Sequence, residues 1–106
     1  MVLNVFIGNQ PIQIDIPPKV ACDGHEFFAH IDQDMDKGWK IGPTYVESPT
    51  KDMRIQIVAD RLLAALETKK VVLIELLAGY ILHSDPTIKA VKIDTDGEPL
   101  NTVIVR

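Results

Sequence analysis

Carboxylates and a histidine gather between Glu26 and Asp36, and these side chains could coordinate a divalent metal ion. If the segment is helical, Glu26, His30 and Asp34 follow one another at intervals of four residues and share one face of the helix. Carboxylates and an imidazole on one face are ligands that divalent metals accept. The sequence therefore gives a hypothetical metal site made of Glu26, His30, Asp32, Asp34 and Asp36.

The same acidic run gives only partial support for a calcium loop. Asp32, Asp34 and Asp36 alternate as the first three ligands of an EF-hand do. That loop also needs glycine at its sixth position and glutamate at its twelfth. This chain has Lys37 and Pro43 at those positions. A solvated acidic helix end is therefore the simpler interpretation, with the metal site as its alternative.

Cys22, His25 and His30 are residue types found in zinc sites and in thiolate–imidazole catalysis. A structural zinc site needs four ligands, and no second cysteine or histidine pair has a suitable spacing. A catalytic thiolate needs an orienting third group and an oxyanion hole, which no motif supplies. We therefore assign no catalytic residue, and we favour a protein without enzymatic activity while leaving that question open.

Composition and charge argue against two classes of partner. The net charge is −4, whereas nucleic-acid-binding proteins normally carry a basic surface. The longest apolar run covers residues 71–82 and is shorter than the roughly 20 residues that span a membrane. The first residues lack the basic region of a signal peptide, and the single cysteine forms no internal disulfide. We expect a cytoplasmic protein that binds neither nucleic acid nor membrane.

Hydrophobic periodicity predicts the elements that must position these residues. Alternating or β-branched runs predict strands at residues 2–7, 12–16, 88–94 and 101–105. Apolar residues at helical spacing predict helices at residues 24–36, 49–67 and 71–83. The order ββ-α-α-α-ββ, with strands at both ends, indicates one α+β domain over residues 1–106. We expect an antiparallel or mixed sheet built from the two terminal hairpins, with the helices packed on one face.

Local signals set the expected helix boundaries. Asp23 stands three residues before Glu26, which is the spacing of a capping box. Ser48 before Pro49 is typical of a helix start. The last two helices are separated only by residues 68–70, and so short a connection predicts an αα-hairpin. One continuous helix is the alternative, because neither glycine nor proline interrupts it.

The apolar run at residues 71–82 predicts an interface. A surface helix normally has one apolar stripe, whereas this segment is apolar nearly all round, with Glu75 as its one charge. The preceding helix and the sheet can cover two sides of it. The remaining side carries Glu75, Gly79 and Tyr80, and we expect it to contact a second copy of the chain or another protein.

Three functions are compatible with these residues, and no motif identifies a family or an organic cofactor. The first is a small accessory or protein-interaction module that forms a homodimer. The second is a divalent-metal-binding protein that uses residues 26–36. The third is a small-ligand-binding protein or enzyme with a pocket between sheet and helices. The expected walls of that pocket are aromatic: Phe27, Phe28, Trp39, Tyr45 and Tyr80.

Overall fold

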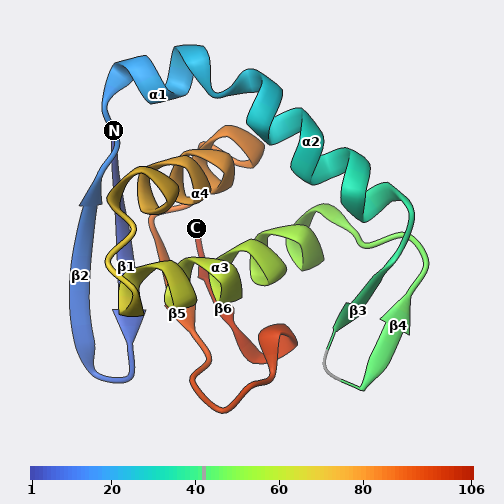
Figure 1. The fold of residues 1–106 in the computed structure, drawn as a ribbon. Helices are drawn as coiled ribbons and strands as arrows, with labels where there is room; N and C mark the ends of the chain where they lie inside the picture. The colour runs from blue at the N-terminus through green and yellow to red at the C-terminus, as the bar shows by residue number, and fades with distance from the viewer. Residues whose placement is uncertain (42) are drawn as a thin grey trace.

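The computed structural model describes residues 1–41 and 43–106, with the side chain of Ala21 left out. The described residues form α-helices and β-strands in an α+β arrangement, which confirms the predicted fold class (Figure 1). The elements in chain order are β1 (Val2–Ile7), β2 (Gln10–Asp15), α1 (Pro18–Asp23), α2 (His25–Asp36), β3 (Trp39–Ile41), β4 (Thr44–Val46), α3 (Lys51–Glu67), α4 (Val71–Ser84), β5 (Ala90–Ile93), the 3-10 turn η1 (Pro99–Asn101) and β6 (Val103–Val105).

The main sheet joins the two ends of the chain. Its strand order is β2-β1-β5-β6. β1 pairs antiparallel with β2 and β5 pairs antiparallel with β6, so both predicted terminal hairpins form. β1 and β5 run parallel, with Val5 opposite Val91, which makes the sheet mixed. β3 and β4 form a separate two-stranded hairpin that the sequence pattern does not predict.

The helices form a layer over one face of this sheet. Figure 1 shows α3 and α4 in front of β5 and β6, with α1 and α2 running over α4. Alternation places Leu3 and Val5 of β1 toward the helices, and both are fully buried. Leu62 of α3 and Ile81 of α4 meet them in one core. Burying apolar side chains from both layers is the main favourable contribution to the stability of the fold.

Residues 68–70 reverse the chain between α3 and α4, as predicted. Lys69 has a φ of 56°, in the left-handed region that non-glycine residues seldom adopt. The Thr68 hydroxyl donates to the Ala64 carbonyl at 2.9 Å, and the Lys70 amide donates to the Ala65 carbonyl at 3.1 Å. These bonds satisfy carbonyls at the end of α3. The αα-hairpin is confirmed, and a single continuous helix is excluded.

Two predicted helix caps were wrong. α2 begins at His25 after Gly24, because α1 runs through Asp23 and leaves it no role as an N-cap. Gly24 is required there, since a Cβ atom would lie 2.6 Å from the Val20 carbonyl oxygen. Thr50 caps α3, and its hydroxyl oxygen accepts from the amide of the third helical residue at 3.2 Å. The predicted helix start at Ser48 lies two residues before Thr50, so the position of the start was nearly right but the capping residue was wrong.

Asp85, which is buried, ties the end of α4 to the last strand. It accepts hydrogen bonds from the Thr87 hydroxyl at 2.5 Å and from Arg106 Nε at 2.8 Å. The Lys51 ammonium lies 3.6 Å from Asp85 Oδ2, the oxygen that also accepts from Arg106. The hydrogen bonds from Thr87 and Arg106 hold the pKa of Asp85 well below its usual range. The carboxylate is therefore a charged link between the helical layer and the C-terminus.

This link predicts a dependence of stability on pH. The folded chain holds Asp85 ionised more strongly than the unfolded chain does, so its contribution is present above about pH 4 and is lost as the pH falls below that value. In the variant Asp85→Asn, the free energy of unfolding should fall less steeply as the pH is lowered. Urea unfolding at several pH values between 7 and 3 checks this, with the exposed Asp34→Asn as control. Equal acid dependence in both variants would contradict the assignment.

Candidate functional site

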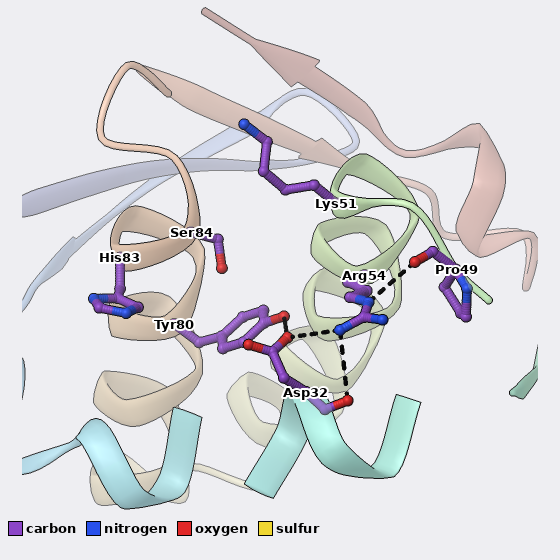
Figure 2. Close-up of a pocket in the computed structure, with 7 residues that line it drawn as sticks. All are labelled: Asp32, Pro49, Lys51, Arg54, Tyr80, His83 and Ser84. Atoms are coloured by element: carbon purple, nitrogen blue, oxygen red, sulfur yellow. Dashed lines mark hydrogen bonds and ion pairs between the residues drawn. The ribbon is translucent and has the colours of Figure 1, made fainter. Parts of the chain in front are cut away.

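A pocket of about 460 Å³ opens where α2, α3 and α4 meet (Figure 2). Its lining comes from these three helices and from the turn before α3, and consists of Asp32, Pro49, Lys51, Arg54, Tyr80, His83 and Ser84. Apart from the proline, each of these residues carries a polar or charged side chain. The pocket is therefore built for a polar ligand and is shared by segments far apart in the sequence.

Side chains from three helices meet at one carboxylate of this pocket. The Tyr80 hydroxyl donates to Asp32 Oδ1 at 2.6 Å, and Arg54 Nη1 donates to the same oxygen at 3.2 Å. Arg54 also donates from Nη2 to Asp36 Oδ1 at 2.6 Å and from Nε to the Pro49 carbonyl at 3.0 Å. Each guanidinium nitrogen has a partner, so the orientation of Arg54 is fixed.

The protonation states in this network follow from burial and hydrogen bonding. Burial raises the pKa of Tyr80 well above its ordinary value, and the hydrogen bond to Asp32 raises it further. Burial lowers the pKa of Arg54, but its hydrogen bonds to Asp36 and Asp32 outweigh that effect and the net shift is upward. At neutral pH Tyr80 is therefore a neutral donor, and Arg54 keeps its positive charge.

Helical periodicity explains why Asp32 and Asp36 face the same arginine. Phe28, Ile31 and Met35 form the buried stripe of α2. Asp32 lies beside this stripe, and Asp36 follows it one turn later on the same side. The two carboxylates can therefore both bind one guanidinium from α3. These ion pairs hold α2 against the α3–α4 hairpin.

The predicted metal ligands are dispersed in the structure. Glu26, His30 and Asp34 are exposed, whereas Asp32 and Asp36 bind Arg54. In the part of the chain that the structure describes, no group of three or more His, Cys, Asp or Glu side chains could hold a metal ion. The metal site stays a prediction, and ligation by Asp32 and Asp36 would require Arg54 to release them.

The side of α4 that was expected to meet a partner lies against the chain itself. Tyr80 is only 1% exposed, and a Cβ atom on the buried Gly79 would lie 3.2 Å from Phe28 Cζ. α1 and α2 cover this side, while Glu75 is half-buried. A partner contact at Glu75 stays a prediction. The most exposed apolar residues of α4 are at its start: Val71 is 64% and Val72 is 71% exposed.

The pocket lies among helices, whereas the sequence predicted one between sheet and helices with aromatic walls. Of the expected wall residues, Tyr80 lines it directly. Phe28 packs edge-on to Tyr80, with ring centroids 6.1 Å apart, and stacks on His83 at 5.1 Å. Trp39 lines a smaller pocket of about 360 Å³ between β3, α3 and the segment that leads into η1. Tyr45 is 61% exposed and donates to a backbone carbonyl instead.

Sequence analysis missed the basic side of the pocket. No role was predicted for Arg54, Lys51 or Ser84. One signal was available: Asp32 and Asp36 form an acidic pair at an i, i+4 spacing, which can bind a single arginine from a neighbouring helix. That signal does not tell which arginine is bound.

No protein-family model, curated protein or solved structure matches this chain. Among the described residues, no helix is both long enough and apolar enough to cross a membrane. The class of protein that the fold defines is an α+β domain with a mixed sheet covered by helices on one face. Its function must be argued from the pocket and the surface alone.

Proposed function

We propose that this chain binds a small anionic molecule, carrying a carboxylate or phosphate group, in the pocket between α2, α3 and α4. The observation that carries the proposal is the charge of the lining. The chain has a net charge of −4, yet among the side chains that line the pocket Lys51 and Arg54 are positive and Asp32 alone is negative, since Asp36 and Asp85, which lie near these cations, are outside the lining. Such a local excess of positive charge attracts anions to a surface that otherwise repels them.

Lys51 is the side chain that is most free to contact the ligand. It is 59% exposed and lies 3.6 Å from Asp85, a distance at which an exposed ion pair contributes little to stability. In Figure 2 it lies across the pocket from Asp32, on the same side as Ser84. Its flexible ammonium can turn toward an anion, because Arg106 already satisfies Asp85 at 2.8 Å.

Other hydrogen-bond donors converge on the same pocket. Ser84 contributes a hydroxyl and His83 an imidazole, and Phe28 holds the His83 ring by stacking. Pro49 and Lys51 place the first turn of α3 at the wall, where the positive end of the helix dipole favours negative charge. Arg54 contributes a fixed positive charge at the base of this arrangement.

The size of the pocket fits this proposal. Pockets for small molecules measure roughly 300–1,000 Å³, and this one of about 460 Å³ suits a ligand of metabolite size. We propose binding and not catalysis, since Tyr80 and Arg54 have hydrogen bonds that fix the structure around the ligand.

The variant Lys51→Met tests the proposal. It should weaken the binding of citrate or inorganic phosphate about fivefold to tenfold, the effect of losing one charge-assisted contact. Lys19→Met on α1 is the matched control, since it removes an exposed lysine outside the pocket. Thermal shift screening finds the better anion, because ligands that bind the native state raise the melting temperature, and NMR titration then gives the affinities. No shift with any anion, or equal weakening in both variants, would refute the proposal.

Protein interaction by self-association is the second candidate function, and exposed apolar side chains support it. Val72 is 71% exposed, and Val2 and Val103 are each 52% exposed. Val2 and Val103 lie on the same face of the main sheet, and apolar groups gathered on one surface mark contact sites more often than scattered ones do. A homodimer in the cytoplasm belongs to this candidate, and a reducing compartment suits a chain with the single cysteine Cys22.

A further inference from the structure

The outer face of the main sheet is open. Among the described residues the α-helices all lie on the other face, and α3 and α4 lie in front of β5 and β6 in Figure 1. Side chains of the strands that point away from the helices therefore have no second layer above them. Along β1 the alternation is clear: Leu3 and Val5 are buried, whereas Val2 is 52% exposed.

The strand pairing aligns the outward side chains in three rows across the sheet. The rows are Pro11–Phe6–Lys92–Val103, Gln13–Asn4–Ala90–Val105 and Asp15–Val2. We call this set of ten residues the outer sheet face. Six of the ten are apolar: Val2 and Val103 are each 52% exposed, whereas Ala90 is buried.

Apart from the buried Ala90, the apolar residues on this face lie outside the hydrophobic core. A sheet with one face in water normally alternates apolar residues inward with polar residues outward. β2 follows that rule with Gln13 and Asp15. β1 and β6 depart from it, because Phe6, Val103 and Val105 point outward and none of them belongs to the hydrophobic core. These side chains are available to a partner.

The charges of the outer sheet face indicate which partner fits. Its charged residues are Lys92 in the first row and Asp15 in the third, on different strands. In the part of the chain that the structure describes, neither forms an ion pair. In a face-to-face dimer the two copies are related by a two-fold axis that lies in the interface. If this axis runs midway between Lys92 and Asp15, Lys92 of each copy lies opposite Asp15 of the other. The face is thus complementary to itself in charge as well as in apolar character.

We propose that two copies of this chain associate face to face through the outer sheet face. The inference deepens the second proposed function by naming its surface and its partner. The sheet edges are less suited to association: β2 contains Pro11, which has no amide hydrogen, and β6 has only three residues. Ten residues a side is below the 20–30 of a standard interface, so we expect a weak dimer with a dissociation constant in the micromolar range or above.

Sedimentation equilibrium of the full chain over about 5–500 µM tests the dimer. Lys92→Asp places carboxylates opposite one another at both symmetric positions and should raise the dissociation constant about tenfold or more. The double variant Asp15→Lys/Lys92→Asp restores the pairing with the signs exchanged, and it should return to within about threefold of the wild type. Lys19→Asp on α1 makes the same change of net charge away from the face and should have little effect.

A second variant and a second measurement keep the surface testable if Lys92→Asp unfolds the chain. Val103→Glu inserts a charge at a 52% exposed position of the same face and should also weaken the dimer. Dilution should move the NMR amide signals of β1, β5 and β6 and leave those of α3 in place. A monomer at every concentration overturns self-association altogether. A dimer that none of the sheet variants weakens overturns the surface while self-association stands.

Discussion

Replacing Tyr80 with alanine is expected to lower the free energy of unfolding by about 4 kcal/mol. Replacing it with phenylalanine should lower it by only about 1 kcal/mol. Tyr80 is 1% exposed and is among the largest fully buried side chains of the chain. Alanine therefore opens a cavity between α4 and α2, whereas phenylalanine keeps the ring and loses the 2.6 Å hydrogen bond to Asp32.

The small effect of Tyr80→Phe follows from the exposure of its partner. The side chain of Asp32 is 48% exposed, so water can replace the lost hydroxyl, and Arg54 still donates to the carboxylate at 3.2 Å. The ring itself keeps its edge-on contact with Phe28. The two variants therefore separate the packing contribution of Tyr80 from its hydrogen bond.

Urea unfolding of both variants at pH 7 measures the difference, and alkaline unfolding adds a second test. Because burial and then Asp32 raise the pKa of Tyr80, the unfolded chain loses this proton first, and stability should fall as the pH rises above about 10. Tyr80→Phe removes that contribution, whereas the control Tyr45→Phe, at a 61% exposed residue, leaves it. Equal stability of the alanine and phenylalanine variants at pH 7 would contradict a packed ring.

The parts of the sheet that depend on local sequence patterns could be predicted. Alternation along β1 and β2 places Leu3, Val5 and Ile14 inward, and a short turn joins the two strands. The parallel pairing of β1 with β5 could not be predicted, because Val5 and Val91 are far apart in the sequence and no local pattern fixes their register. Three elements escaped prediction because they are short: α1 has six residues, and β3 and β4 have three each.

The packing of other helices around α4 also could not be predicted from local sequence patterns. The sequence identified a helix that needs cover all round, and counting α3 and the sheet left one side free. The structure fills that side with α1 and α2, whose Phe28 packs against Gly79. Where a third helix docks depends on matching side chains between distant segments, and periodicity within each segment does not contain that information.

The candidate site was found only in part for the same reason. Asp32 stood out as a carboxylate beside a helix face, and Tyr80 as a polar group in an apolar helix. Arg54, which shares Asp32 with Tyr80, lies 22 residues after Asp32, and no motif in the sequence assigns it a role. Acidic residues at helical spacing fit a metal ion and an arginine equally well, and the tertiary structure decides which of them is close.

Gly79→Leu is expected to destabilise the chain by about 2–3 kcal/mol, whereas Gly79→Ala should change its stability by less than about 1 kcal/mol. A Cβ atom at this position lies 3.2 Å from Phe28 Cζ and 3.5 Å from Val20 Cγ1. For alanine, the gain in helix propensity of about 1 kcal/mol offsets this tight contact. Leucine adds three further carbons to a space that Phe28 already fills, so α2 must move or α4 must bend.

A double-mutant cycle in urea tests whether Phe28 is the cause. Phe28→Leu shortens the ring side chain that meets position 79, so Gly79→Leu should be less destabilising in that background than in the wild type, by at least about 1 kcal/mol. The control is Gly79→Leu combined with Phe27→Leu, the neighbouring ring on α2, which is absent from the atoms nearest to Gly79. If both backgrounds give the same destabilisation, the crowding at Gly79 arises elsewhere. A coupling confined to Phe28 identifies this contact as the point where α2 packs most closely against α4.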